Sequence, residues 1–75
     1  MKSIAISVTN YKDYPSLNYA SFCYMDGAIT ILHTLTYEEG MRELKKYETI
    51  LNKTADVEVN EYNNTIIYTN LHGLL

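Results

Sequence analysis

Two side chains of this sequence could form a nucleophilic pair, Cys23 and His33. A cysteine attacks as its thiolate, which a neighbouring histidine or a helix start favours. Both residues lie in alternating runs that we expect to form adjacent strands, where successive side chains point to opposite faces. The expected pairing puts Cys23 on one face and His33 on the other. We therefore expect a passive strand thiol, and a hydrogen-bonded histidine at the end of an apolar face.

Other chemistry-bearing groups give equally little support for catalysis. His33 and His72 have no His, Cys or carboxylate at metal-binding spacing, so no metal site is expected. Four glutamates between positions 37 and 51 are typical of a solvated helix face, because Glu38 can pair with Arg42 at i, i+4. Phosphate loops, dinucleotide fingerprints and serine elbows do not occur. We expect a protein that is not an enzyme and uses no cofactor.

Tyrosine is the unusual residue of this composition, with eight Tyr against one Phe and no Trp. Three tyrosines lie in or next to the turn-rich segment 10–18. Interfaces are enriched in tyrosine, because it offers a large contact area at low entropic cost. We predict these three as contact anchors and two later glutamates as electrostatic guides. The predicted binding residues are Tyr11, Tyr14, Tyr19, Glu58 and Glu61.

The same tyrosines have a structural alternative, in which one or two rings fold back over the open end of the small core. The spacing places other tyrosines in the body of the fold. Tyr37, Tyr47 and Tyr68 are expected in the core or at its edge, and Tyr24 on an apolar strand face.

A hairpin followed by a capped helix is the clearest structural signal. Asp26-Gly27 stands between alternating runs at 19–25 and 28–35, which predicts a two-residue turn. That turn pairs Tyr24 with Ile29, Phe22 with Ile31, and Ala20 with His33 on one apolar face. Thr36 and Glu39 form a capping box that predicts a helix over 37–51.

Two residues of this helix carry further expectations. Gly40 costs about 1 kcal/mol relative to Ala in a helix interior, which indicates a close approach to the sheet. Asn52 can supply the left-handed residue that ends the helix.

Both ends of the chain have the two-residue period of strands. Residues 3–9 alternate cleanly, and beyond the helix Asn63-Asn64 is the expected turn of a second hairpin. Glu61 then lies near Ile66 at the edge of the core, an unfavourable place for a carboxylate. The apolar tail 71–75 packs against the body or a partner, or frays. The side chains expected to share one face of this hairpin are Val57, Val59, Ile66 and Tyr68.

These elements predict one α+β domain over residues 1–75. We expect a small antiparallel sheet of about five strands, in the chain order β-β-β-α-β-β, with one helix packed on one face. The other face stays open to solvent or to a second molecule.

Composition narrows the class of partner. The net charge of −3 is an ordinary value for solubility, although acidic residues gather in the C-terminal half and would suit a basic protein partner. No basic patch is visible, so we expect no membrane association and favour nucleic acid less than protein. One cysteine excludes an internal disulfide, and we find no signal peptide or transmembrane stretch, so we expect a cytoplasmic location. Richness in Asn, Ile, Lys and Tyr with a single Arg is compatible with a low-GC bacterium or its phages.

We therefore expect a small non-enzymatic protein-binding factor, accessory or inhibitory, of a kind that a phage or mobile element could encode. Two alternatives stay open. One is a single-stranded nucleic-acid-binding module that stacks bases on sheet or loop tyrosines. The other is a homo-oligomeric structural protein, dimeric through the open face or the apolar tail.

Overall fold

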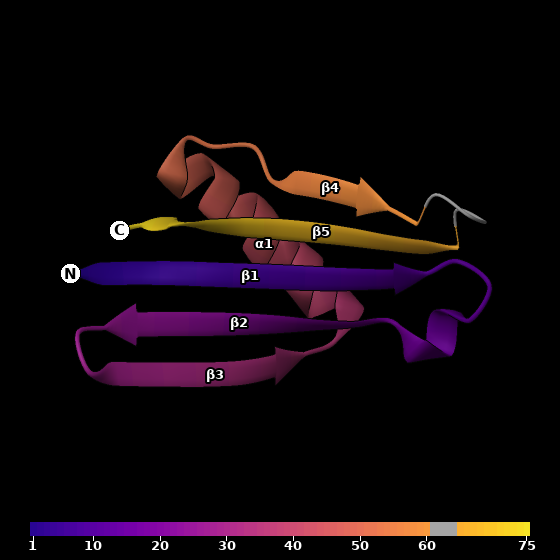
Figure 1. Ribbon diagram of the computed structural model, residues 1–75, viewed down its shortest axis with the longest axis horizontal. Helices are drawn as coiled ribbons and strands as arrows, with labels where there is room; N and C mark the ends of the chain where they lie inside the picture. Colours follow the sequence, from indigo (N-terminus) through magenta and orange to yellow (C-terminus); the bar gives the residue numbers. More distant parts are fainter. Residues whose placement is uncertain (61–64) are drawn as a thin grey trace.

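The sheet is built around the first strand of the chain. The computed structural model describes residues 1–60 and 65–75. In it the predicted α+β fold is confirmed: five antiparallel strands form one sheet in the order β3-β2-β1-β5-β4, with one helix packed against it (Figure 1). The strands are β1 (Lys2–Tyr11), β2 (Tyr19–Asp26), β3 (Ile29–Leu35), β4 (Asp56–Val59) and β5 (Ile66–Leu74).

Helix α1 (Tyr37–Leu51) has the predicted bounds, and local hydrogen bonds explain both ends. At its start, the Glu39 backbone N–H donates to the Thr36 hydroxyl at 3.2 Å, and the Thr36 N–H donates to the Glu39 carboxylate at 3.0 Å. At its end, Asn52 adopts the left-handed conformation, with φ 51° and ψ 50°. α1 crosses one face of the sheet obliquely (Figure 1).

The core lies between α1 and the central strands. Gly40 brings the two layers together, because a Cβ added there would overlap the Ala20 Cβ and lie 3.3 Å from Val8 Cγ2. The predicted close approach is therefore confirmed. The buried apolar side chains are Ile4, Ile6, Val8, Ala20, Leu44 and Leu71.

The first hairpin has the predicted faces but a different register. Asp26 pairs with Ile29, so the loop residues are Gly27 and Ala28, not Asp26 and Gly27. Gly27 has φ 59° and Ala28 has no positive φ, as in a type II′ turn, whereas the expected type I′ turn needs two such residues. The predicted pairs are wrong by two residues, a shift that keeps every side chain on its face. The observed pairs are Tyr24 with Ile31, Phe22 with His33, and Ala20 with Leu35.

For the second hairpin, the predicted assignment of side chains to the two sheet faces is wrong. Val59 pairs with Ile67, one residue away from the register expected for a turn at Asn63-Asn64, a turn that lies outside the described residues. A one-residue shift moves side chains to the opposite face. Val57 and Val59 accordingly share the helix side with Ile67 and Thr69, while Ile66 and Tyr68 lie on the other face.

Packing against the central strand explains this correction. Leu71 pairs with Ile6 and is buried under the helix, which fixes the register of β5 against β1. Tyr68 is three residues from Leu71 and therefore points to the opposite face. The apolar tail does not fray, because residues up to Leu74 belong to β5 and the Leu75 N–H donates to the Lys2 carbonyl at 2.8 Å.

Candidate functional site

The sheet face that carries no helix, called here the helix-free face, has a centre of small side chains. Its members on β1 alternate with the buried Ile4, Ile6 and Val8. One polar pair spans this centre: the Ser7 hydroxyl donates to Asn70 Oδ1 at 2.9 Å. These small side chains are half-buried. The central residues are Ser3, Ala5 and Ser7 on β1 and Ser21 and Cys23 on β2.

One end of the helix-free face carries a row of larger side chains. Four side chains, one from each of four neighbouring strands, lie directly opposite one another, and we call them the tyrosine row. They are Tyr19 on β2, Thr9 on β1, Tyr68 on β5 and Glu58 on β4. Thr9 is only 2% exposed although no helix covers it. Side chains directly opposite in an antiparallel pair have Cβ atoms about 5 Å apart, so the flanking tyrosines can cover Thr9. The tyrosines themselves are 47% (Tyr19) and 37% (Tyr68) exposed.

The connection between β1 and β2 extends this end of the sheet. Tyr11 is the last residue of β1, pairs with Ile66, and is half-buried. Its backbone N–H donates to Asn18 Oδ1 at 2.6 Å, which ties the two ends of the connection together. Tyr14 precedes a short 3₁₀ helix, Pro15–Leu17, and is 66% exposed.

The predicted site residues are thus only partly brought together. Tyr19 and Glu58 belong to the same row, Tyr11 lies beside it, and Tyr14 lies in the connection. Glu61 lies outside the described residues. The prediction that Tyr68 lies in the core or at its edge is wrong. Tyr68 is an exposed member of the row, because its position on β5 points it away from the helix.

The charge of this face is acidic at its β4 border. Glu58 lies opposite Tyr68, and Asp56 lies opposite Asn70 on the same side. The described strands place no Lys or Arg on the helix-free face. Lys12 follows β1 in the connection, where its N–H donates to the Thr65 carbonyl at 2.8 Å. An anionic ligand therefore meets little complementary charge here.

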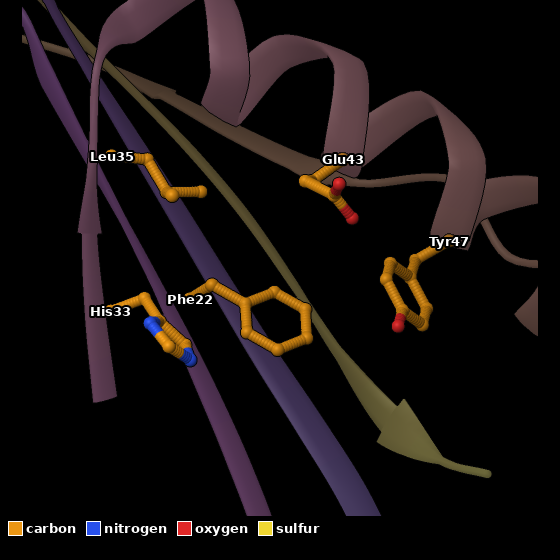
Figure 2. Close-up of a pocket in the computed structure, with 5 residues that line it drawn as sticks. All are labelled: Phe22, His33, Leu35, Glu43 and Tyr47. Atoms are coloured by element: carbon orange, nitrogen blue, oxygen red, sulfur yellow. The ribbon is translucent and has the colours of Figure 1, made fainter. Parts of the chain in front are cut away.

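A pocket of about 250 Å³ lies on the helix side of the sheet, beside β3. Figure 2 shows His33 and Leu35 on β3 and Phe22 on β2 across the pocket from Glu43 and Tyr47 on α1. The Phe22 and Tyr47 ring centroids are 5.4 Å apart, so two of the lining side chains form an aromatic pair. We call this the β3 pocket.

The two residues considered as a nucleophilic pair, Cys23 and His33, do not come together. His33 lies on the helix side, whereas Cys23 pairs with Leu32 on the helix-free face, as the alternation predicts. Among the described residues no three His, Cys, Asp or Glu side chains come together as metal ligands. The β3 pocket holds one histidine and one glutamate among apolar groups, which suits an apolar side chain.

Comparison with known proteins adds no relationship. No protein-family model matches the chain, and no curated protein or solved structure matches it. Within the described residues no helix is long and apolar enough to span a membrane.

Proposed function

We propose that this protein is a protein-binding module that docks a partner on the tyrosine row of its helix-free face. The observation that carries the proposal is the burial of Thr9 between two exposed tyrosines. Tyrosine loses little side-chain entropy on binding, because it has only two χ angles. Rigid, exposed aromatic rings are typical anchors of protein interfaces.

The partner chemistry that fits is a protein surface bearing arginine or lysine. An arginine guanidinium can stack on a tyrosine ring, a contact of about 0.5–2 kcal/mol. Glu58 stands beside Tyr68 at the end of the row, where its carboxylate can accept hydrogen bonds from the same guanidinium. The small side chains of Ser7 and Ser21 lie next to the row and leave space for the partner's backbone.

We further propose an accessory or inhibitory role. All the groups that would contact the partner lie on one face and one connection of a small domain. Such a domain acts by covering a surface of its partner. Tyr11 and Tyr14 extend the contact along the connection.

A second candidate function is single-stranded nucleic-acid binding. Aromatic side chains on neighbouring strands of an open sheet are the arrangement on which unstacked bases pack. That mode also needs Lys or Arg near the rings to hold phosphate, whereas Glu58 and Asp56 border this row. The charge therefore ranks this function below protein binding.

The proposal is tested by capture from nuclease-treated lysate, followed by reconstitution with the purified captured protein. We expect the double variant Tyr19→Ala with Tyr68→Ala to bind that protein about tenfold or more weakly, because two anchors are removed. The control is Ile50→Ala, which truncates an exposed side chain of α1. Equal binding by both variants would contradict the proposal.

Charge reversal separates the two candidate functions. Glu58→Lys should weaken a basic protein partner, because it replaces the complementary carboxylate with a like charge. The same substitution should strengthen binding of a labelled oligo-dT strand if bases stack on the row, and that binding should fall steeply with added salt. Tight binding of oligo-dT by the unmodified protein would favour the second candidate.

A further inference from the structure

The edge strand β3 is unusually unprotected. Natural sheets blunt exposed edges with charges, prolines or short strands, because unpaired backbone groups recruit other strands. β3 is seven residues long, and no charged residue occurs from Gly27 to Tyr37. Its apolar side chains are exposed on both faces: Ile29 and Ile31 on the helix side, and Leu32, which is 67% exposed, on the helix-free face.

The hydrogen bonds at the two ends of β1 show which backbone groups of β3 point away from the sheet. Leu75 donates to Lys2, and Lys12 donates to Thr65, so even-numbered residues of β1 bond to β5. In an antiparallel ladder the bonding direction alternates along a strand, so odd-numbered residues of β1 bond to β2.

The same alternation carries across β2 to the edge. Odd-numbered residues of β2 face β1, so its even-numbered residues bond to β3. Their partners on β3 are odd-numbered, because Asp26 pairs with Ile29. The backbone N–H and C=O groups of Thr30, Leu32 and Thr34 consequently point away from the sheet.

We propose that β3 binds a second copy of this chain by antiparallel pairing of the two β3 strands, centred on Leu32. Leu32 then lies opposite Leu32 of the second copy, with Thr30 opposite Thr34 on either side. All three outward-pointing residues pair, which gives about six interchain hydrogen bonds. Opposed threonines and opposed apolar side chains are favourable cross-strand pairs.

This register also supplies an occupant for the β3 pocket. On the helix side it sets Ile31 of the second copy opposite His33, and Ile29 of the second copy opposite Leu35. His33 and Leu35 both line the pocket, which has a volume of about 250 Å³ and is also lined by the aromatic pair Phe22 and Tyr47. The exposed isoleucines of each copy are therefore directed toward the pocket of the other.

Local charge opposes a second copy at the β4 edge but not at the β3 edge. The β4 edge carries Asp56 and Glu58 within four residues, so two β4 strands side by side would bring carboxylates together. Two β3 strands bring no like charges together, although each chain has a net charge of −3. This interface uses neither Tyr19 nor Tyr68, so it does not depend on the proposed function.

The test is sedimentation velocity over a range of protein concentrations. We expect the mass to rise from 8.7 kDa toward twice that value as concentration increases. Leu32→Pro should weaken the dimer by about tenfold or more, because it removes the outward N–H at the centre of the interface. The ladder to β2 does not use that N–H, and proline is tolerated on an edge strand in that orientation.

A matched variant on the other edge controls for general effects of proline. Val57 of β4 is 59% exposed, and its backbone points outward, because the Asn60 N–H bonds to Ile66 and the direction alternates. Val57→Pro should leave the dimer intact. Should Leu32→Pro fail to fold by circular dichroism, Leu32→Lys replaces it, since it opposes two like charges at the centre.

Three outcomes would overturn the proposal. The unmodified protein could stay at 8.7 kDa at every concentration. A dimer could persist in both Leu32 variants, which would place it elsewhere. Finally, the protein could stay monomeric and bind an extended peptide along β3, which would assign the edge to a foreign strand.

Discussion

Strand β1 sends every second side chain under α1 and the others to the helix-free face, so neighbouring residues meet different surroundings. Ile4, Ile6 and Val8 are branched, apolar and buried. Ser3, Ala5 and Ser7 between them are small and only partly covered. A single residue step therefore separates buried core side chains from accessible ones. Packing free energy resides mainly on the helix side, and the other side carries the row on which we propose that a partner docks.

The largest test of this separation compares two adjacent residues. Ile6→Ala should lower the free energy of unfolding by about 2–5 kcal/mol, because it leaves a cavity under α1. Ser7→Ala removes one hydrogen bond to Asn70 and should lower it by about 1 kcal/mol. Urea denaturation of both variants measures the difference. Similar losses would show that both faces contribute equally to stability.

A second test concerns the distance between helix and sheet. Gly40→Ala should lower the free energy of unfolding by about 1–3 kcal/mol, because the added methyl overlaps Ala20. This outcome opposes helix propensity, which alone favours Ala by about 1 kcal/mol. Lys45→Ala, at an exposed helix position, should change stability by less than about 0.5 kcal/mol. Stabilisation by Gly40→Ala would mean that α1 does not pack closely against Ala20 and Val8.

The smallest effect is a pH dependence at the start of α1. Hydrogen bonds from the Thr36 backbone N–H and then the Thr36 side chain lower the pKa of Glu39 from its ordinary value of 4.5. A lowered folded-state pKa contributes stability above the ordinary value, and that contribution is lost as pH falls through the lowered one. Glu39→Gln should therefore flatten this part of the stability profile. Thermal melts between about pH 3 and pH 6 measure it, and an unchanged slope would contradict the assignment.

Local chemistry made the helix predictable from the residues alone. Thr36 and Glu39 satisfy the first backbone groups, and Asn52 tolerates the left-handed end, so both bounds depend on side chains a few positions apart. The alternation of β1 was equally sufficient to identify the buried face.

Strand register was less predictable, because it depends on distant residues. Leu71 is 65 positions from its partner Ile6, and their pairing, not the turn sequence, decides which face Tyr68 occupies. The awkward placement of Glu61 beside Ile66 was a signal against the expected register. In the first hairpin Gly27 can be the second residue of a type I′ turn or the first residue of a type II′ turn. The two choices differ by two residues in strand register, so the turn sequence alone does not decide the pairing.

The candidate site shows the same division. Tyr11, Tyr14 and Tyr19 were identified by their clustering along the chain, which needs no knowledge of topology. Tyr68 joins Tyr19 across Thr9 only because β5 returns to the centre of the sheet. No local pattern in the sequence records that return. Whether these residues bind a partner stays a prediction.

The central position of β1 has a consequence for folding. Its two neighbours come from opposite ends of the chain, and the two termini lie side by side (Figure 1). During synthesis, β1 can pair with β2, and β2 with β3, at an early stage. The other edge of β1 stays unpaired until residues 66–74 leave the ribosome. The final pairing closes nearly the whole chain into one loop, and such long-range contacts slow folding. The nascent protein therefore passes through a stage in which the middle of its future sheet is temporarily an edge.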